Sequence, residues 1–364
     1  MNFSKLALTI LISSLFFVSC TNDDTNEVPL GGYDNGFLIL NQGGFGHNDA
    51  SVSYVSSDFL IAQNDIFSVV NPSITLGDVG QDIGFNNELA YIVLNVSNKI
   101  EIVNRYTLKS VGTINSGLKN PRYIAFANGK GYVTNWGDGS VATDDFVAVI
   151  DLSTNKVSNT IPVAEGPERI LMNSGKLYVA HKGGFSYGNK ISVIDATTNA
   201  VSNTITVGDV PESMEVKDGT LWVACSGNPS YVKAPLVETA GQIVKVNLST
   251  NKVASTIAYS DATKHVSNLA LNGSDVYYTI DSDIYKMSTS ATALPTTSAF
   301  STTAQGVYGV YSFAVHGNHI YVGDAGDYAH NGKVYVYALA APSIGTLEKT
   351  FSVGVIPAGF YFND

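Results

Sequence analysis

Short apolar runs alternate with polar turns along most of this chain, and the same order of runs returns about every 40 to 55 residues. The clearest neighbouring copies begin at Pro167 and Pro211. Each contains an apolar strand, a glycine turn, a second strand of the Leu-x-Val-Ala type, a long loop, a third strand, a Thr-Asn turn and a fourth strand. Further copies begin at Gly36, Gln81, Pro121, His265 and Tyr311. A period of this length predicts propeller blades rather than a short-period solenoid.

Val, Ile, Tyr, Thr and Phe dominate the apolar runs, so we expect an all-β chain with almost no helix. Seven copies predict a seven-bladed β-propeller of four-stranded antiparallel blades over residues 36–364. The first copy lacks an inner strand, and residues 356–364 match the missing one, so we predict that the C-terminal strand joins the N-terminal blade and closes the ring. Six or eight blades remain open if residues 64–79 are misinterpreted.

The N-terminus has the pattern of a signal peptide over residues 1–19. Lys5 precedes an apolar run from Leu6 to Val18, which is too short for a membrane span. The Ser-Cys pair that follows resembles the bacterial lipobox, and we therefore interpret Cys20 as a lipid anchor. The alternative is an ordinary cleaved signal with an incidental cysteine.

Residues 20–35 are small, polar and acidic, and we interpret them as a lipidated flexible tether. Asp23 and Asp24 resemble the acidic export tag of Bacteroidetes surface lipoproteins. This resemblance implies an outer-membrane location, lipid-anchored and facing the cell exterior.

The net charge limits the possible binding partners, and the cysteine content limits the possible disulfides. Cleavage removes Lys5 and leaves 19 basic against 31 acidic side chains, which disfavours nucleic acid and anionic lipid as partners, so that the anchor alone would hold the chain to a membrane. With Cys20 acylated, Cys225 has no partner for an intramolecular disulfide, and we expect it to be a small buried apolar residue.

One face of the predicted ring carries the candidate binding residues. Because the chain reverses at every turn, the loops between second and third strands emerge on the same face as the links between blades. These loops are long and rich in aromatic and polar residues: 41–50, 135–145, 181–190, 225–242 and 323–333. The turns of the opposite face, such as 173–176 and 217–220, are short. Long surface loops tend to carry function, so we expect the ligand on the long-loop face.

The candidates come from these loops and from the first residues of the inner strands, although any one loop aromatic could instead pack on its own blade. They are Phe45, His47, Arg122, Trp136, Asp138, Arg169, His181, Phe185, Tyr187, Tyr231, Tyr328 and His330, with Glu168 and Glu212 at the channel mouth.

No catalytic motif is present, and we expect a binding protein rather than an enzyme, with no cofactor and no metal. His47, His181 and His330 lie in equivalent loops of different blades and could converge on a metal or a metal-containing ligand. The pair His316 and His319 lies in a short turn of the other face, which favours a solvated turn.

The repeat units, together with NQGGFGHNDASVSYV near the start and VGVIPAGFYF at the end, resemble the YncE-like, DUF5074 class of Bacteroidetes surface-lipoprotein propellers. The similarity covers nearly all of the mature chain. That class includes surface propellers that bind cobalamin and cap a TonB-dependent outer-membrane transporter. The resemblance implies capture of a nutrient such as cobalamin or another corrinoid.

Two other function classes stay open. The same face could be an adhesion platform for a protein or a glycan, which a flat surface would favour. A lactonase-type propeller hydrolase would need carboxylate and amide ligands around a calcium ion in the channel, and the sequence offers no clear set.

Overall fold

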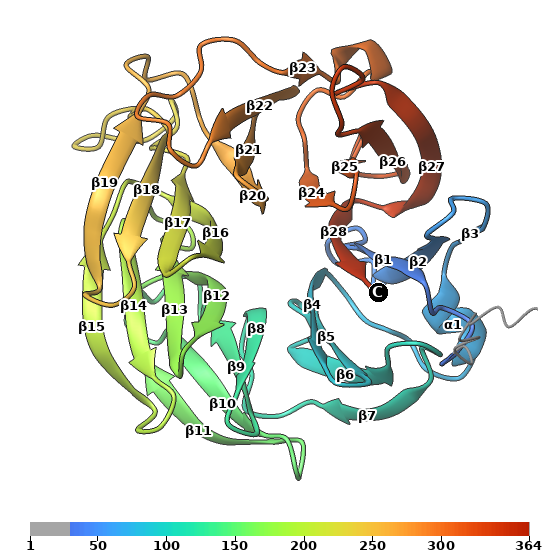
Figure 1. Ribbon diagram of the computed structural model, residues 1–364. Coiled ribbons are helices and arrows are strands. Elements are labelled where there is room, and N and C mark those ends of the chain that lie inside the picture. Colours follow the sequence, from blue (N-terminus) through green and yellow to red (C-terminus); the bar gives the residue numbers. More distant parts are fainter. Residues whose placement is uncertain (1–29, 364) are drawn as a thin grey trace, which may run out of the picture.

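The computed structural model describes residues 30–363 and shows a ring of seven four-stranded antiparallel sheets around a central channel (Figure 1). The seven-bladed prediction is confirmed. The predicted leader and the lipidation site Cys20 lie outside the described residues. Within residues 30–363, no helix is both long and apolar enough to cross a membrane.

Every blade has an inner strand at the channel, two middle strands and an outer strand at the rim. In this order, blade 1 contains β28 (Pro357–Phe362), β1 (Gly36–Asn41), β2 (Ser51–Ser56) and β3 (Ala62–Gln63). Blade 2 contains β4 (Gly80–Asn86), β5 (Leu89–Leu94), β6 (Lys99–Asn104) and β7 (Ser110–Ile114). Blade 3 contains β8 (Pro121–Ala127), β9 (Lys130–Asn135), β10 (Phe146–Asp151) and β11 (Lys156–Pro162). Blade 4 contains β12 (Pro167–Asn173), β13 (Lys176–His181), β14 (Lys190–Asp195) and β15 (Ala200–Thr206). Blade 5 contains β16 (Pro211–Lys217), β17 (Thr220–Cys225), β18 (Gln242–Asn247) and β19 (Lys252–Ala258). Blade 6 contains β20 (Ser267–Asn272), β21 (Asp275–Ile280), β22 (Asp283–Ser288) and β23 (Phe300–Ser301). Blade 7 contains β24 (Ser312–His316), β25 (His319–Asp324), β26 (Asn331–Ala338) and β27 (Leu347–Val355).

Helix is confined to two short segments of the described chain, α1 (Ile66–Val70) and the 3-10 turn η1 (Thr303–Gln305). Both follow blades whose outer strand has only two residues, β3 and β23. Helix α1 packs against β2 and buries Ile66 and Phe67 in the core. The ambiguous stretch 64–79 therefore holds a short helix and a link rather than a further blade.

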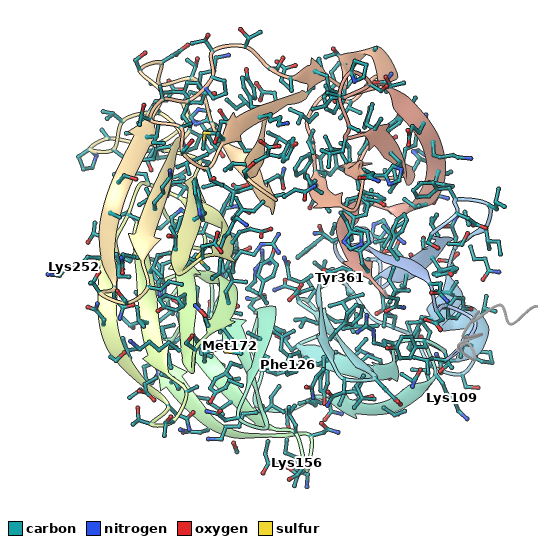
Figure 2. All side chains as sticks on the ribbon, in the orientation of Figure 1. Lys109, Phe126, Lys156, Met172, Lys252 and Tyr361 are labelled. Atoms are coloured by element: carbon teal, nitrogen blue, oxygen red, sulfur yellow. The ribbon has the colours of Figure 1, made fainter. Side chains whose placement is uncertain are left out.

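The core lies between neighbouring blades, which explains why the strands are apolar on both faces. Tyr178 and Val193 of blade 4, for example, share one cluster with Val223 and Val244 of blade 5. A sheet covered on both sides needs near-continuous apolar runs. The side chains fill the spaces between blades, with Lys252 at the outer rim and Tyr361 near the channel (Figure 2).

The Thr-Asn turns of the repeat join successive blades. Asn155, Asn199 and Asn251 adopt left-handed backbone conformations at the turn between third and fourth strands. Each accepts a hydrogen bond from a buried tyrosine of the preceding blade: Tyr91 to Asn155 (3.2 Å), Tyr132 to Asn199 (2.8 Å) and Tyr178 to Asn251 (3.0 Å). Asn tolerates this conformation better than most residues, and its side chain supplies the acceptor.

The predicted ring closure is confirmed, because β28 pairs with β1 as the innermost strand of blade 1. Arg105 of blade 2 stabilises this pairing, because it donates hydrogen bonds to the Asn363 side chain (2.7 Å) and to the Phe362 carbonyl (2.8 Å). Tyr33, which the sequence placed in the tether, packs edge-on against Tyr54. Packed structure thus begins slightly before residue 36.

Candidate functional site

The side chains that line the channel come from the second and third residues of the inner strands. In six blades a β-bulge at this point sets one extra residue of the inner strand against its neighbour. The paired channel-lining positions are Gln81 and Asp82, Arg122 and Tyr123, Glu168 and Arg169, Glu212 and Ser213, Asn268 and Leu269, and Ala358 and Gly359. A bulge re-aims side chains, so each of these blades presents two consecutive residues to the channel.

A repeated backbone contact fixes where the long loops begin. The residue before the inner strand is left-handed in five blades, at Val79, Asn120, Gly166, Val210 and Ile356. In each of these blades its carbonyl accepts the N–H of the residue just after the second strand, as in Lys182 to Gly166 (3.0 Å) and Ser226 to Val210 (2.9 Å). Left-handed Val and Ile are strained, which indicates that the surrounding structure enforces this junction.

A glycine follows directly in four of these loops, at Gly43, Gly137, Gly183 and Gly227, each with positive φ. At Gly183 a β-carbon would lie 2.5 Å from the Gly188 nitrogen, where the two ends of the loop approach each other. Only glycine fits at this point of close backbone approach. The residue between strand and glycine is thereby held at the channel mouth (Gln42 and Lys182) or in a pocket beside it (Ser226 and Trp136).

Two ion pairs lie at the mouth. Arg122 contacts Glu168 with two hydrogen bonds of 3.0 and 2.7 Å, and its guanidinium lies 4.1 Å from the Trp136 ring. Burial opposes both charges, but their mutual attraction prevails, so that the pKa of Arg122 lies above its ordinary value and that of Glu168 below it. Lys182 pairs with Glu212 at 3.7 Å, and the charge of Glu212 raises the pKa of Lys182.

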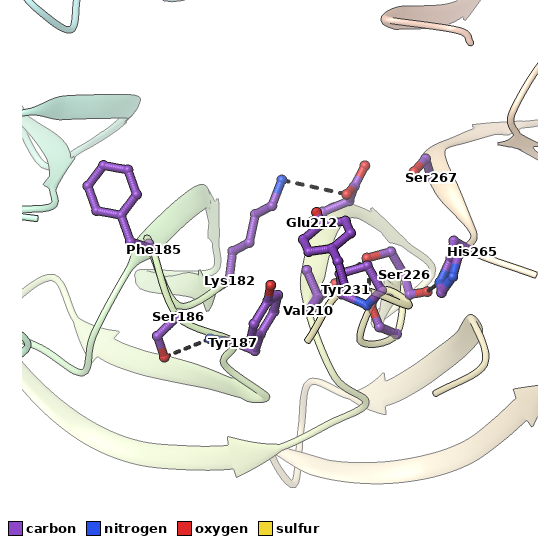
Figure 3. Close-up of a pocket in the computed structure, with 13 residues that line it drawn as sticks. Lys182, Phe185, Ser186, Tyr187, Val210, Glu212, Ser226, Tyr231, His265 and Ser267 are labelled. Atoms are coloured by element: carbon purple, nitrogen blue, oxygen red, sulfur yellow. Dashed lines mark hydrogen bonds and ion pairs between the residues drawn. The ribbon is translucent and has the colours of Figure 1, made fainter. Parts of the chain in front are cut away.

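A pocket of about 390 Å³ lies beside this mouth, between blades 4 and 5. The loop 181–190 contributes Phe185 and Tyr187, the loop 225–242 contributes Tyr231, and His265 lies on the link to blade 6. Figure 3 shows Lys182 extending toward Glu212, with Tyr187 and Tyr231 beside them. Because Lys182 and Glu212 also line the channel mouth, the pocket and the mouth form one continuous surface.

The structure brings eight of the predicted residues together at this surface. Phe185, Tyr187 and Tyr231 line the pocket, and Glu212 lines both the pocket and the channel mouth. Arg122, Glu168 and Arg169 line the channel mouth. Trp136 connects the two groups, with its ring 5.8 Å from Phe185. Phe185 and Tyr231 remain 79% and 77% exposed, so their apolar surface is available to a ligand.

Other predicted residues lie on the same face but outside this pocket. Phe45 and His47 are exposed on the blade 1 loop. Asp138 pairs with Lys119 at 3.7 Å.

The blade 7 candidates form their own small group. The ring of Tyr328 lies 5.8 Å from that of Tyr311, and His330 contacts Asp327 at 2.7 Å.

His181 is placed differently from the other candidates. It is the last residue of β13 rather than a loop residue, it is 1% exposed, and its Nε2 contacts the Ser192 hydroxyl at 2.8 Å. Burial lowers the pKa of His181 to about 4. Asn41, Asn135 and Cys225 end the equivalent strands and are also buried, so this position supports the fold; the expectation for Cys225 is thereby confirmed. Within residues 30–363, no three His, Cys, Asp or Glu side chains gather as a metal site requires.

Sequence reasoning missed several residues of the site. Lys182, His265 and Ser226 line the pocket, and Tyr123, Tyr311 and Gln42 line the channel mouth. The signal was present for three of these residues, because Gln42, Lys182 and Ser226 each directly precede one of the repeated loop glycines.

Solved structures share the fold at low sequence identity. A functionally unknown protein from Desulfotomaculum acetoxidans DSM 771 matches with a TM-score of 0.60 and 11% identity, covering 88% of this chain and 99% of that chain. The computationally designed Ika8 protein matches at 0.57 and 10%, covering 92% of both chains. Dihydro-heme d1 dehydrogenase NirN in complex with DHE matches at 0.56 and 14%, covering 92% and 76%. Such identities establish the fold alone.

No curated protein matches this chain. A family described as a domain of unknown function, DUF5074, matches residues 35–362, which is nearly the whole of the propeller. The chain therefore belongs to the DUF5074 family, and its fold is a seven-bladed β-propeller.

Proposed function

We propose that this protein captures a small-molecule nutrient on its long-loop face, at the pocket between blades 4 and 5. The observation that carries the proposal is the pocket itself, a concave site of about 390 Å³ with aromatic walls, an ion pair and a histidine. Pockets that combine apolar walls with a few polar groups are the usual sites of small ligands. Leaving Phe185 and Tyr231 in water has a free-energy cost that a ligand would remove.

We propose cobalamin or another corrinoid as the ligand. A corrinoid is a broad, flat macrocycle with amide arms, so it needs aromatic surface for its body and hydrogen-bonding groups around its edge. Tyr187 and Tyr231 offer the first, whereas Lys182 and Glu212 offer the second. The continuity of pocket and channel mouth gives a ligand of that breadth room to lie across both. The resemblance to surface cobalamin-binding propellers supports the same choice.

Calorimetric titration of the purified protein with cobalamin and with cobinamide tests the proposal. We expect one-to-one binding that weakens about tenfold or more in Tyr187→Ala and in Tyr231→Ala, because central aromatic anchors carry most of the binding energy. Trp136→Ala should weaken binding as well, since this ring contacts both Phe185 and Arg122. Val201→Ala, on the outer strand β15, is the matched control and should bind normally. Absence of binding with both corrinoids would contradict the ligand assignment.

We also propose that the protein is lipid-anchored at Cys20 in the outer membrane, facing outward, and delivers its ligand to a TonB-dependent transporter. The support is the leader pattern and the resemblance of class. Cys20→Ala should release the protein from the membrane fraction. The anchored protein, purified from the membranes of its own cells in mild detergent, should retain such a transporter, and its absence would contradict the partnership.

A protein or glycan partner is the second candidate, because exposed aromatic side chains extend beyond the pocket. Phe45 is 81% exposed on blade 1 and Tyr308 is 95% exposed on the link to blade 7. Tyr328→Ala and Tyr308→Ala separate the two candidates. Both should leave small-ligand binding unchanged if the pocket is the site, and should weaken binding of a broad partner.

A further inference from the structure

Arg169 is the centre of a second feature, which lies inside the channel below the mouth. As the third residue of β12, it is presented to the channel by the β-bulge of blade 4. It lines three connected cavities of about 110, 280 and 260 Å³, so its side chain lies where they meet. A water molecule occupies about 30 Å³ of liquid, which leaves each cavity room for a small polar group.

The guanidinium of Arg169 differs from the other two cations of the channel. Arg122 is bonded to Glu168, and Lys182 is paired with Glu212. Arg169 instead lies against the face of the Tyr123 ring, 4.2 Å from its centre. Within residues 30–363, its guanidinium has this ring contact and longer-range charge interactions, but no hydrogen bond and no close ion pair. Its N–H donors therefore face the channel unused.

Asp82 and Glu215 face the channel near Arg169, but neither forms a hydrogen bond or a close ion pair with its guanidinium. Asp82 on β4 attracts Arg169 at longer range and accepts hydrogen bonds from the Ile124 N–H (3.0 Å) and the Tyr361 hydroxyl (3.1 Å). Glu215 on β16 lines the lower cavity, where burial raises its pKa to about 7 and the charge of Arg169 only partly offsets that effect. Near neutral pH Glu215 is therefore protonated part of the time.

The wall beside Arg169 offers a second donor. The Tyr123 hydroxyl accepts a hydrogen bond from Gln81 at 3.1 Å, and no acceptor among residues 30–363 takes its own proton. A planar guanidinium and a hydroxyl proton on one wall match a group that accepts several hydrogen bonds through two or more oxygens. Arginine is the side chain best suited to such groups, because its fork of donors matches carboxylate and phosphate geometry.

We propose that the channel contains an oxyanion site at Arg169 and Tyr123, which binds a carboxylate or phosphate group. Neither Arg169 nor Tyr123 lines the aromatic pocket, but both line the channel mouth that adjoins it, so the site could be filled by a free anion or by an acidic arm of a larger ligand entering from the mouth. The chemistry is the same in both cases, since the group must bring the acceptors that the protein withholds from Arg169.

Arginine side-chain NMR tests the site directly, because the chain contains only three arginines, Arg105, Arg122 and Arg169. The complete protein, labelled with 15N-arginine, is titrated with inorganic phosphate and separately with acetate at constant pH and ionic strength. We expect a saturable shift of the Arg169 Nε–H signal, with the signals of Arg105 and Arg122 nearly unchanged. An Arg169 signal that does not move with either anion, or three signals that move together, overturns the proposal.

Variants that are expected to weaken phosphate binding, and one that is expected to strengthen it, give a second test. Arg169→Gln should weaken phosphate binding by about tenfold or more, as expected for loss of a charged hydrogen-bonding partner, and Tyr123→Phe should weaken it several-fold while keeping the ring. Glu215→Gln should strengthen it at pH 8, because it removes a nearby negative charge. Lys252→Gln removes one positive charge at the outer rim and should have no effect (Figure 2). Equal phosphate affinity in Arg169→Gln and Lys252→Gln would contradict the site.

Two further measurements identify the source of the anion and distinguish failure of this proposal from failure of the nutrient-capture proposal. Phosphate shifts of Arg169 without any corrinoid binding would support the site and refute the corrinoid ligand. If phosphate and a corrinoid bind simultaneously, the site takes a free anion; if an acidic ligand of the pocket displaces phosphate, its arm occupies the site.

Discussion

On the short-turn face, Asp151 and Asp195 accept hydrogen bonds from the turns that follow them. Asp145 on the long-loop face is buried, and Glu215 in the channel is half-buried. The Ser153 hydroxyl and N–H lower the pKa of Asp151, and the N–H groups of Thr197 and Thr198 lower that of Asp195. Burial raises the pKa of Asp145 to about 6 and that of Glu215 to about 7. Carboxylates of the first kind stabilise the folded chain at neutral pH, and those of the second kind oppose folding there.

Tyrosines show the same contrast. Tyr178 is buried between blades and bonded to the turn residue Asn251, whereas Tyr231 is 77% exposed in its loop. The turn residues of the short-turn face recur from blade to blade and join neighbouring blades. On the long-loop face the backbone junctions and loop glycines recur, but the aromatic and charged side chains differ from loop to loop, and these include exposed rings and a buried carboxylate. Departures from local stability concentrate where proteins function, which is why we place binding on that face.

The largest expected difference between the faces concerns these two tyrosines. Tyr178→Ala should lower the free energy of unfolding by about 3–5 kcal/mol, because it removes a fully buried ring and a hydrogen bond. Tyr231→Ala should stay within about 0.5 kcal/mol of the unaltered protein. Denaturant unfolding of the two variants measures both effects. Equal destabilisation would mean that the loop tyrosine also supports the fold.

The next effect tests the half-buried carboxylate Glu215 of the channel. The pKa of Glu215 is about 7 when folded against an ordinary 4.5, so the folded state holds this proton more tightly. Its destabilising effect is therefore absent below about pH 4.5, grows as pH rises to 7 and is complete above that value. Glu215→Gln should raise stability by about 1–3 kcal/mol at pH 8, with no difference at pH 4. Unfolding measured across this range would contradict the pKa if the difference were constant.

The smallest effect concerns the turn asparagines. Asn251→Ala should cost about 1–2 kcal/mol, because alanine disfavours the left-handed backbone and leaves the Tyr178 hydroxyl without its acceptor. Asn251→Gly restores the backbone freedom and should recover about half of the loss. Thermal unfolding of both variants separates the two contributions. If Asn251→Gly were as unstable as Asn251→Ala, the hydrogen bond alone would account for the asparagine.

Particular residues show how far sequence reasoning reached into the site. Phe185, Tyr187 and Tyr231 were predicted from long, aromatic loops, and the structure places all three around one pocket. Lys182 and His265 were missed, since neither stands out in composition. His181 was predicted as the first residue of the loop 181–190. In the structure His181 is instead the last residue of β13, where it pairs with Lys190 of β14 and is buried.

The sequence by itself determined the repeat, the seven blades and the closing strand, because alternation of apolar runs and turns is a local pattern that recurs with a fixed period. Only the tertiary structure decided which side chains contact one another. The bulges that turn Glu168 and Arg169 together toward the channel, and the pairing of Arg122 across blades with Glu168, depend on strand register and on contacts between residues 46 positions apart. Such contacts leave no periodic trace in the sequence, and they decide which charges of the channel are satisfied and which remain available to a ligand.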